Sequence, residues 1–451
     1  MSALAQDDQK SESASSSVTF LDIVKSPAVM VLCGVVIGAG IGAAFAAGDI
    51  TDEWYIDVLA LPGSLWMQLL QCLVLPMVII SMIQSMVSLR QLPGSRTLAF
   101  ALVGLYMTTT VIALMEALVI AVPYIGNLVE ALPASSIEAS EDYTSTVEDM
   151  TFIDALLGVF EGMTPENVIN DAAQSDLLPV IITAVVFGIC IKDKQEDGSP
   201  TVTLQLLSQV NDVVTTALMA VMKLAPIGVA SIVFSAAVSV DIEQAGKALV
   251  FYLTGLWIAM ACQVFIVYPL LLVVGGGRNP FSYYKNCIPA LAMALGMSSS
   301  LATLPTTKKC ADKNGIRAEV RDLALSLGAT INMDGAGMGF IFQSVWLSAI
   351  QGVEFGISKV LLTGIAAFVC SVGTSPIPSS GAVALVVLKI AGVPINSTFG
   401  LVMAVEFISD RSRTMVNVLG DLSVVAVIDK HFGHSIVELE AEKKKIGQAE
   451  P

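Results

Sequence analysis

The chain has 451 residues, of which 55% are hydrophobic and only 14% are charged. A soluble protein of this length carries about a quarter charged residues, so the composition argues against a soluble fold. The formal net charge of −16 leaves no basic face for phosphates and argues against a nucleic-acid partner. The apolar runs are long and continuous rather than alternating, which predicts an all-α polytopic membrane protein.

A polar tail and six apolar helices are predicted before residue 276. Residues 1–20 are polar and Ser-rich and are predicted to be a disordered tail. The six helices are predicted at 22–47, 57–88, 97–123, 177–191, 204–239 and 247–275. The acidic interval 124–176 contains no Lys or Arg, and basic loops remain cytoplasmic, so it is predicted to be a long extracellular loop. The same rule predicts a cytoplasmic amino terminus and a cytoplasmic tail at 431–451.

Two re-entrant hairpins are predicted in the last third of the chain. The apolar run 286–307 has basic residues on both sides, and "MSSSLATLP" divides it into halves too short to span a bilayer. It is therefore predicted to enter and leave on the cytoplasmic side. A second run, 357–392, surrounds "GTSPIPSSG", whose two prolines and two glycines prevent a continuous helix. Its flanks lack Lys and Arg, so it is predicted to enter from outside.

Each hairpin is followed by a helix with polar residues in its middle. The first of these helices contains "ATINMDGAGMG", and the second contains "ISDRSRTMVNVLGD". The same pair of elements thus occurs twice with opposite sidedness, which is the pattern of an inverted repeat with a binding site near the midplane. The complete prediction is eight transmembrane helices plus two re-entrant helical hairpins.

The last helix has one polar face, because its polar residues are three or four positions apart. These residues are Asp410, Arg413, Thr414, Asn417 and Asp421. Charges inside a membrane mark functional sites, and the planar donors of Arg413 suit a carboxylate while Asp410 suits an ammonium group. Arg411 falls off this face and is expected to support a neighbouring hairpin. The alternative is a set of internal salt bridges that fix helix packing.

Oxygen atoms near the same face suit a hard cation. Asn417 and Asp421 supply side-chain oxygens, and "GATINMD" supplies the carbonyls of Gly328 and Asn332 and the carboxylate of Asp334. For this stretch the alternative is a kinked helix.

Three further polar features are weaker signals. The "SSS" and "GTSPIPSSG" tips offer N–H groups and hydroxyls that could close over a carboxylate, although a simple turn would explain the first tip. A polar patch in the third helix, "YMTTT", contains Tyr106, Thr109 and Thr110. Threonine in a membrane helix usually bonds a carbonyl of its own helix, which is the alternative here.

The motifs "SSSLATLP", "GATINMDG", "GTSPIPSSG" and "DRSRTMVNVLGD", in this order, resemble the glutamate transporter family of dicarboxylate/amino acid:cation symporters. "LPGSLWMQLLQCLVLPMV" and "YMTTT" are also similar, and "DRSRT" and "NVLGD" are most similar to eukaryotic excitatory amino acid transporters. The resemblance implies a plasma-membrane homotrimer in which each protomer moves a transport domain past a scaffold, like an elevator. The scaffold would comprise 21–95 and 177–240, and the transport domain 96–123 and 241–430.

The resemblance also implies roles for individual residues. The substrate contacts would be Ser299, Ser300, Gly381, Asp410, Arg413, Thr414 and Asn417. One sodium site would use Gly328, Asn332, Asn417 and Asp421, and another would use Tyr106, Thr109, Thr110, Asn332 and Asp334. A third would use backbone around Thr330 and between Ser371 and Thr374. Sodium ions are thus the expected cofactors.

Some positions depart from the family pattern. Ala336 replaces a threonine near the substrate, as it does in the neutral amino acid exchangers. Phe340 stands where proton-coupled members carry a glutamate, which excludes proton coupling through that position.

The predicted function is sodium-coupled uptake of acidic amino acids. The alternatives are a neutral amino acid exchanger, a dicarboxylate symporter or a mainly anion-conducting member of the same fold. An enzyme is not predicted, because His431 and His434 lie together beyond the last helix and no Ser-His or metal-ligand constellation accompanies them.

Overall fold

The computed structural model describes residues 27–48, 53–90, 96–132, 157, 164–173, 177–192, 194–195, 199–239, 242–373, 380–396 and 398–447. These residues form helices joined by short connections, without a β-strand in the described part, so the predicted all-α fold is confirmed. The predicted tail at 1–20, most of the predicted loop at 124–176 and the tip of the second hairpin lie outside the described residues.

The helices include long apolar spans and several broken ones. In chain order they are α3 (Pro27–Ala47), α4 (Glu53–Arg90), α5 (Arg96–Leu128), α7 (Val168–Ala173), α8 (Leu177–Cys190), α9 (Val202–Lys223), α10 (Ala225–Ser239), α11 (Ile242–Cys262), η2 (Gln263–Val267), α12 (Tyr268–Leu270), η3 (Leu271–Gly275), α13 (Pro280–Met297), α14 (Ser300–Lys313), α15 (Ala318–Ile331), α16 (Asp334–Ile350), α17 (Ile357–Gly373), α18 (Ser380–Ile390) and α19 (Phe399–Gly447). Three segments of the described chain are long and apolar enough to cross a membrane, namely Trp54–Val87, Phe100–Leu128 and Glu243–Gly275. A fourth results if α9 and α10 together form one bent span.

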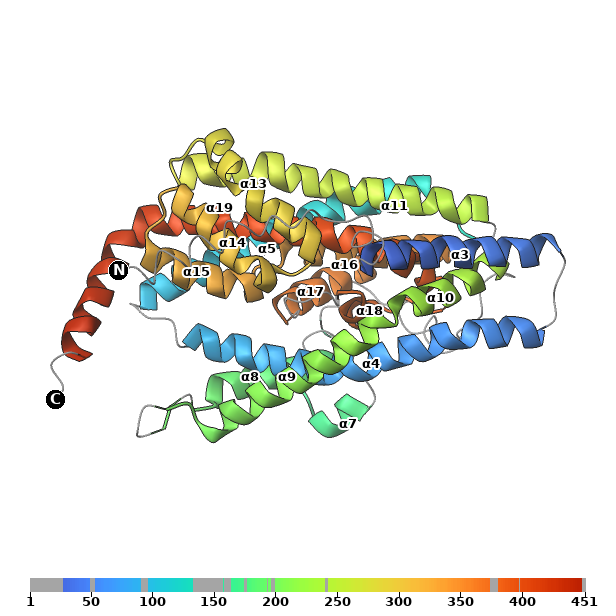
Figure 1. The fold of residues 1–451 in the computed structure, drawn as a ribbon, viewed down its shortest axis with the longest axis horizontal. Helices are drawn as coiled ribbons and strands as arrows, with labels where there is room; N and C mark the ends of the chain where they lie inside the picture. The colour runs from blue at the N-terminus through green and yellow to red at the C-terminus, as the bar shows by residue number, and fades with distance from the viewer. Residues whose placement is uncertain are drawn as a thin grey trace, which may run out of the picture.

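Helices α3, α4, α8, α9 and α10 pack together as a first group, which we call the apolar group (Figure 1). Small residues bring α3 close to α10. Gly34 and Gly38 face the backbone of Pro226 and Ala230, and a methyl group at either glycine would overlap a carbonyl oxygen of α10. Such close backbone approach is a usual basis of helix packing in membranes, where lipid is as apolar as the side chains.

The predicted single helix at 204–239 is wrong in one respect, because the structure divides it into α9 and α10. The two helices meet at Leu224 with a bend of 55°. Pro226 lies in the first turn of α10, and its ring cannot fit against the preceding turn of a straight helix.

Apart from α7, which packs against α8, the remaining helices form a second group, which we call the polar group, around α16. Every residue of α16 except Ala349 is buried. Helices α5, α11, α17, α18 and α19 pack against α16, and α15 packs along α19 (Figure 1). The functional residues predicted from the sequence lie mainly in this group.

Helices α13 and α14 form the first predicted hairpin. Its tip is shorter than the nine-residue interruption expected, since only Ser298 and Ser299 separate the two helices and Pro305 lies inside α14. Ser298 has a left-handed backbone with φ of 50°, which reverses the chain direction at the tip. Helices α17 and α18 also pack against each other, as expected for the second hairpin.

The two helices that follow the hairpins differ from each other. The first is broken between α15 and α16, where only Asn332 and Met333 leave helical geometry. The last helix, α19, continues without a break across its polar face, in agreement with the single helix predicted there.

The third helix extends beyond its predicted end at residue 123. Helix α5 contains Pro123 and continues to Leu128, so residues 124–128 belong to a helix rather than to the predicted loop. Packing outweighs the proline here, because Ile125 is fully buried and the hydroxyls of Tyr124 and Thr254 lie 2.9 Å apart.

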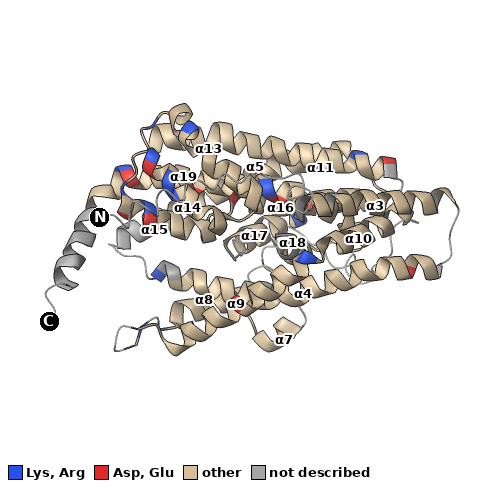
Figure 2. Ribbon diagram, viewed as in Figure 1, with Lys and Arg blue, Asp and Glu red and all other residues tan. Residues whose placement is uncertain are grey.

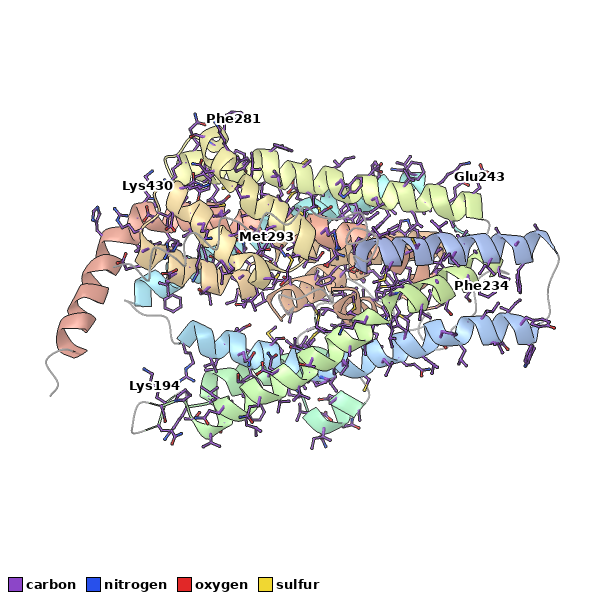
Figure 3. All side chains as sticks on the ribbon, viewed as in Figure 1. Lys194, Phe234, Glu243, Phe281, Met293 and Lys430 are labelled. Atoms are coloured by element: carbon purple, nitrogen blue, oxygen red, sulfur yellow. The ribbon has the colours of Figure 1, made fainter. Side chains whose placement is uncertain are left out.

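Charged residues gather at one end of the molecule, near α13, α14, α15 and the middle of α19, whereas α3, α8 and α10 carry none (Figure 2). Asp429 of α19 binds Arg278 and Arg317 there, at 3.1 and 3.0 Å. Apolar side chains also project outward, as Phe281 does at the edge of the bundle (Figure 3). An apolar outer surface with charges at one end is the distribution expected for a membrane protein.

Candidate functional site

The polar face of α19 lies inside the polar group. Arg413, Thr414, Asn417 and Asp421 are buried, and Asp410 is partly buried. A charged side chain in such surroundings requires a partner, because burial removes its hydration. The partners of these residues differ along the helix.

Arg413 forms an ion pair with Glu406, two turns earlier on the same helix. The same guanidinium nitrogen, Nη2, lies 3.1 Å from the hydroxyl of Ser409. Glu406 also accepts a hydrogen bond of 2.8 Å from Gln343 of α16. The Nε and Nη1 atoms of Arg413 are buried and have no acceptor. The internal salt bridge considered as an alternative is therefore present, but it occupies only one of three guanidinium nitrogens.

Two glycines of α16 allow Arg413 to lie close to that helix. A methyl group at Gly335 would overlap the backbone carbonyl of Arg413, and one at Gly339 would overlap the guanidinium group. No larger residue fits at these positions without displacing Arg413.

Asn417 and Asp421 contact the break between α15 and α16. The Asn417 carbonyl accepts the Gly335 backbone N–H at 2.7 Å, and Asp421 accepts the Asn332 amide at 3.1 Å. The side-chain oxygen of Asn417 thus binds the first turn of α16, whose N–H groups have no partner within the helix.

Gly328 and Tyr106 lie beside the same carboxylate. A methyl group at Gly328 would lie 2.5 Å from an Asp421 oxygen and 2.5 Å from the Tyr106 hydroxyl. The structure therefore brings together all four residues of the first predicted sodium site, Gly328, Asn332, Asn417 and Asp421.

Asp334, at the start of α16, is surrounded by neutral donors. It accepts hydrogen bonds from Thr110 at 2.7 Å, Tyr268 at 2.8 Å and Gln263 at 3.3 Å. The Thr109 hydroxyl lies 3.2 Å from the Asn332 side-chain oxygen. The residues expected for the second sodium site are thus also adjacent.

The local alternative for "YMTTT" is correct in part. The hydroxyls of Thr109 and Thr110 lie 2.9 and 3.0 Å from the Tyr106 carbonyl of their own helix. They also reach Asn332 and Asp334, so the patch joins α5 to the break between α15 and α16.

Asp334 and Asp421 are fully buried carboxylates, and neither has an ion-pair partner among the described residues. Two uncompensated carboxylates in one place favour the binding of cations. No group of three His, Cys, Asp or Glu residues suited to a metal is found in the described part of the chain. The available donors are instead carboxylate, amide, hydroxyl and backbone oxygens, which suit a hard cation such as sodium.

The first hairpin tip contacts α19 through Arg411. Its Nη1 donates to the Ser298 hydroxyl at 3.0 Å, and its guanidinium lies 3.5 Å from the centre of the Phe407 ring. Ser299 caps α14 by accepting the Ala302 backbone N–H at 3.2 Å. Arg411 therefore supports the hairpin, as its place off the polar face predicted, and Ser299 and Ser300 are buried beside it.

Other predicted site residues make only local bonds. The hydroxyls of Thr330, Ser371 and Thr414 each bond a carbonyl of their own helix. Gly381 lies in the first turn of α18, and Thr374 lies outside the described residues. The third predicted sodium site and the second hairpin's substrate contact therefore stay predictions.

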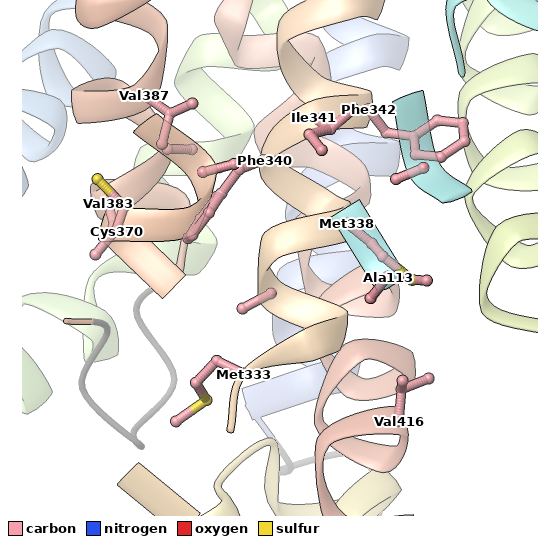
Figure 4. Packing of buried hydrophobic residues seen from close by; sticks show 14 of the residues in the cluster. Ala113, Met333, Met338, Phe340, Ile341, Phe342, Cys370, Val383, Val387 and Val416 are labelled. Carbon is pink, nitrogen blue, oxygen red and sulfur yellow. The ribbon is translucent and has the colours of Figure 1, made fainter. Parts of the chain in front are cut away.

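The two departures from the family pattern are apolar contacts in the structure. Phe340 is fully buried and points from α16 toward Cys370, Val383 and Val387 of the second hairpin (Figure 4). Ala336 is buried near the start of the same helix. No carboxylate stands at position 340 to carry a proton.

Several residues of the site were not predicted. Glu406, Gln343 and Ser409 surround Arg413, while Gln263 and Tyr268 bind Asp334. Polar residues isolated in apolar segments were the available signal. Glu406 in "FGLVMAVEF" is seven residues before Arg413 and therefore on the same face of the helix.

Comparisons with known proteins identify the family of the chain. Residues 28–431 match the model of the sodium:dicarboxylate symporter family. The chain is 27% identical to neutral amino acid transporter B(0) of Rattus norvegicus, over 93% of this chain and 80% of the relative. It is 26% identical to excitatory amino acid transporter 3 of Mus musculus, over 90% and 85% of the two chains. It is 28% identical to the putative sodium-dependent excitatory amino acid transporter glt-4 of Caenorhabditis elegans, over 88% of each.

The matched residues include both groups of helices and all the buried polar residues described above, from Tyr106 to Asp421. The relatives transport amino acids, and both acidic and neutral substrates are represented among their names. The chain therefore belongs to the sodium:dicarboxylate symporter family, whose members are multi-pass membrane transporters and not enzymes.

Proposed function

We propose that the protein takes up acidic amino acids, aspartate or glutamate, together with sodium ions. The observation that carries this proposal is the state of Arg413. It is buried, it lies one turn from Asp410, and two of its guanidinium nitrogens have no acceptor. Buried unpaired donors are costly, and a substrate carboxylate would satisfy them.

The polar face of α19 then binds the two ends of the substrate. Asp410 holds the ammonium group, and Arg413 holds the side-chain carboxylate. The remaining substrate contacts come from Thr414 and Asn417 of α19 and from the two hairpin tips, at Ser299, Ser300 and Gly381. The tips contribute backbone N–H groups at helix starts, which favour an anion.

Sodium binds at the buried carboxylates in this proposal. Asp421 with Gly328, Asn332 and Asn417 holds one ion, and Asp334 with Tyr106, Thr109, Thr110 and Asn332 holds another. A third uses backbone around Thr330, Ser371 and Thr374. Each ion compensates a carboxylate that has no cationic partner in the protein.

The proposal includes movement of the polar group past the apolar group, which acts as the scaffold. Two observations support it. The apolar group is closely packed through small residues, and nearly all buried polar residues belong to the other group. A homotrimer in the plasma membrane, with both termini in the cytoplasm, belongs to the same proposal.

Neutral amino acids are the second candidate substrates, and Glu406 favours them. Because Glu406 already pairs with Arg413, a substrate without a side-chain carboxylate leaves no isolated positive charge in the site. Competition of labelled aspartate uptake by glutamate, alanine, serine and succinate separates the two candidates and the dicarboxylate alternative.

The decisive experiment is uptake into liposomes with and without a sodium gradient, for the wild type and Arg413→Ala. A charge-assisted contact is worth about 1.5–3 kcal/mol, so aspartate uptake should fall about 10- to 150-fold. Alanine and serine uptake should fall much less. Arg90→Ala, at the far end of α4, is the matched control and should leave uptake unchanged. Unchanged aspartate uptake in Arg413→Ala would contradict the proposal.

A further inference from the structure

A further carboxylate, Glu116 of α5, lies in mid-span at the edge of the polar group, outside the proposed substrate and sodium sites. Glu116 is the seventeenth residue of the apolar segment Phe100–Leu128, with twelve residues following it. A helix rises 1.5 Å per residue, so the carboxyl lies about 18 Å from the outer end of that segment. Ionisable residues at such depth are rare and mark functional sites.

The surroundings of Glu116 contain a single partner. Its carboxyl accepts a hydrogen bond from the Cys262 thiol of α11, and its Oε2 atom is buried without a partner. Cys262 also lies in mid-span, in the segment Glu243–Gly275. A thiol is a weak donor and carries no positive charge that could compensate a carboxylate.

Charged and titratable groups on the helices around α5 are engaged elsewhere or do not reach Glu116. Among the residues of α11, α12, α15, α16, α17 and α19 whose side chains are described, these groups are Glu243, Lys247, Tyr252, Cys262, Tyr268, Glu319, Arg321, Asp322, Asp334, Lys359, Cys370, Glu406, Asp410, Arg411, Arg413, Asp421, Asp429, Lys430, His431 and His434. Of these, Cys262 alone has an interaction with Glu116 in the described structure. Arg413 pairs with Glu406, and Lys247 pairs with Glu243 at 2.6 Å.

A proton is the ligand that fits this environment. A carboxylate in hydrocarbon without a cation is costly, and addition of one proton to one of its oxygens cancels the charge. A metal ion would need several ligands, and no group of three His, Cys, Asp or Glu residues suited to a metal includes Glu116 in the described part of the chain. Glu116 is also partly exposed, next to the exposed apolar side chains of Met115 and Val119, and at this depth such a surface faces lipid, which favours the neutral, protonated carboxyl further.

A short path connects Glu116 to the proposed sodium site. Cys262 is the last residue of α11, and the next residue, Gln263, begins a π-helical segment. Gln263 is fully buried and donates to Asp334, while its Oε1 atom has no partner. Single π-helical turns within a helix are frequent at functional sites. Asp334 in turn binds Thr110, six residues before Glu116 on α5.

We propose that Glu116 is a proton-binding site that the polar group carries across the membrane during transport. The site takes up one proton on one side and releases it on the other, with no other bond formed or broken. This inference rests on the proposed function, because it concerns the same transport movement, but it assigns a ligand to a residue outside the substrate and sodium sites.

The test measures two fluxes in the same liposomes, which contain a pH-sensitive dye and receive labelled aspartate under a sodium gradient. The wild type should acidify the lumen as aspartate enters. Glu116→Gln keeps the shape of the side chain but cannot ionise, so it should take up aspartate while proton entry falls at least tenfold. Glu116→Asp keeps an acid and should restore proton entry at least in part. Glu130→Gln is the matched control, since Glu130 is exposed beyond the end of α5, and should behave as the wild type.

The outcomes separate this inference from the proposed function. Proton entry that persists in Glu116→Gln, or uptake by the wild type without proton entry, would overturn the inference alone. Absence of aspartate uptake in the wild type would contradict the proposed function. In that case, or if Glu116→Gln is inactive, infrared difference spectra between high and low pH decide the proton site. A carbonyl band of a protonated carboxyl that is lost in Glu116→Gln supports the site, and an unchanged band overturns it.

Discussion

The apolar group and the polar group have interiors of different chemistry. Among the described residues of α3, α4, α8, α9 and α10, the buried polar side chains are two serines, Ser85 and Ser231. The polar group contains every buried charged residue of the described chain, namely Asp334, Lys359, Glu406, Arg413, Asp421 and Asp429. The interior of the apolar group thus consists of closely packed apolar side chains. The interior of the polar group contains charged side chains, which are costly to bury.

The two groups also differ in how fully their buried polar atoms are hydrogen-bonded or paired within the protein. Ser231 accepts the Gly63 backbone N–H at 2.9 Å and donates to the Leu59 carbonyl, so its bonds are complete within the protein. Arg413, Asp334 and Asp421 are left without full compensation. A bound substrate and its coupled ions can supply the missing compensation, which supports our proposal that substrate and sodium bind in the polar group.

Replacement of Asp334 should give the largest effect. Asp334→Asn keeps the shape and can still accept from Thr110 and Tyr268, but it removes the charge that we assign to a sodium ion. Loss of one partner of a buried charge pair costs about 3–5 kcal/mol, so sodium-dependent uptake should fall more than about 100-fold. The measurement is the initial uptake rate as a function of sodium concentration.

Ser231→Ala is the control from the apolar group. It leaves the Gly63 N–H without its acceptor and should reduce the free energy of unfolding by about 1–3 kcal/mol. The sodium dependence of uptake should not change. If the sodium dependence of uptake is unchanged in Asp334→Asn, or altered in Ser231→Ala, the assignment of sodium binding to the polar group is contradicted.

A methyl group at Gly339 should have an intermediate effect. In Gly339→Ala the added atom overlaps the Arg413 guanidinium, which must move. Overpacking of this kind costs about 1–3 kcal/mol, so the concentration for half-maximal aspartate uptake should rise about 5- to 150-fold. Uptake of neutral amino acids should change less. Gly104→Ala on α5, where an added methyl meets nothing within 4 Å, is the control, and equal effects of the two variants would contradict the role given to Gly339.

The sequence predicted the elements of the polar group better than their contacts. The breaks at Ser298–Ser299 and Asn332–Met333 followed from short apolar halves and from polar residues at membrane depth. The neighbours Asn332, Asp421 and Asp334 also followed, because an isolated charge in an apolar segment has few possible partners. The residue types in a short segment were thus enough for prediction where a polar residue lies at membrane depth and requires a partner.

Contacts between distant segments were not predictable in the same way. Gln263 and Tyr268 bind Asp334 from a helix whose sequence is almost wholly apolar, and only the three-dimensional packing brings them there. The extension of α5 past Pro123 was missed because burial of Ile125 outweighs the local tendency of proline to end a helix. The pairing of Glu406 with Arg413 depends on Gly339, which frees the space for the guanidinium.

The smallest effect is expected for charges outside the apolar segments, in the cluster of Arg321, Asp322 and Asp312. The hydrogen bond from Arg321 lowers the pKa of Asp322 below its usual value, and Lys308 lies 3.1 Å from the same carboxylate. Because the folded pKa is below the unfolded value near 4, the pair stabilises the protein above about pH 4 and loses this contribution as pH falls through the folded pKa.

The magnitude is small because the Asp322 side chain is 50% exposed and water screens the pair. Asp322→Asn should therefore lower the melting temperature of the detergent-solubilised protein by less than about 2 °C at pH 7, with no difference from the wild type well below pH 4. High salt should reduce the difference further. Glu319→Gln, in the same turn of α15, is the control variant. A fall in melting temperature well beyond about 2 °C in Asp322→Asn would contradict the small contribution expected from this exposed pair.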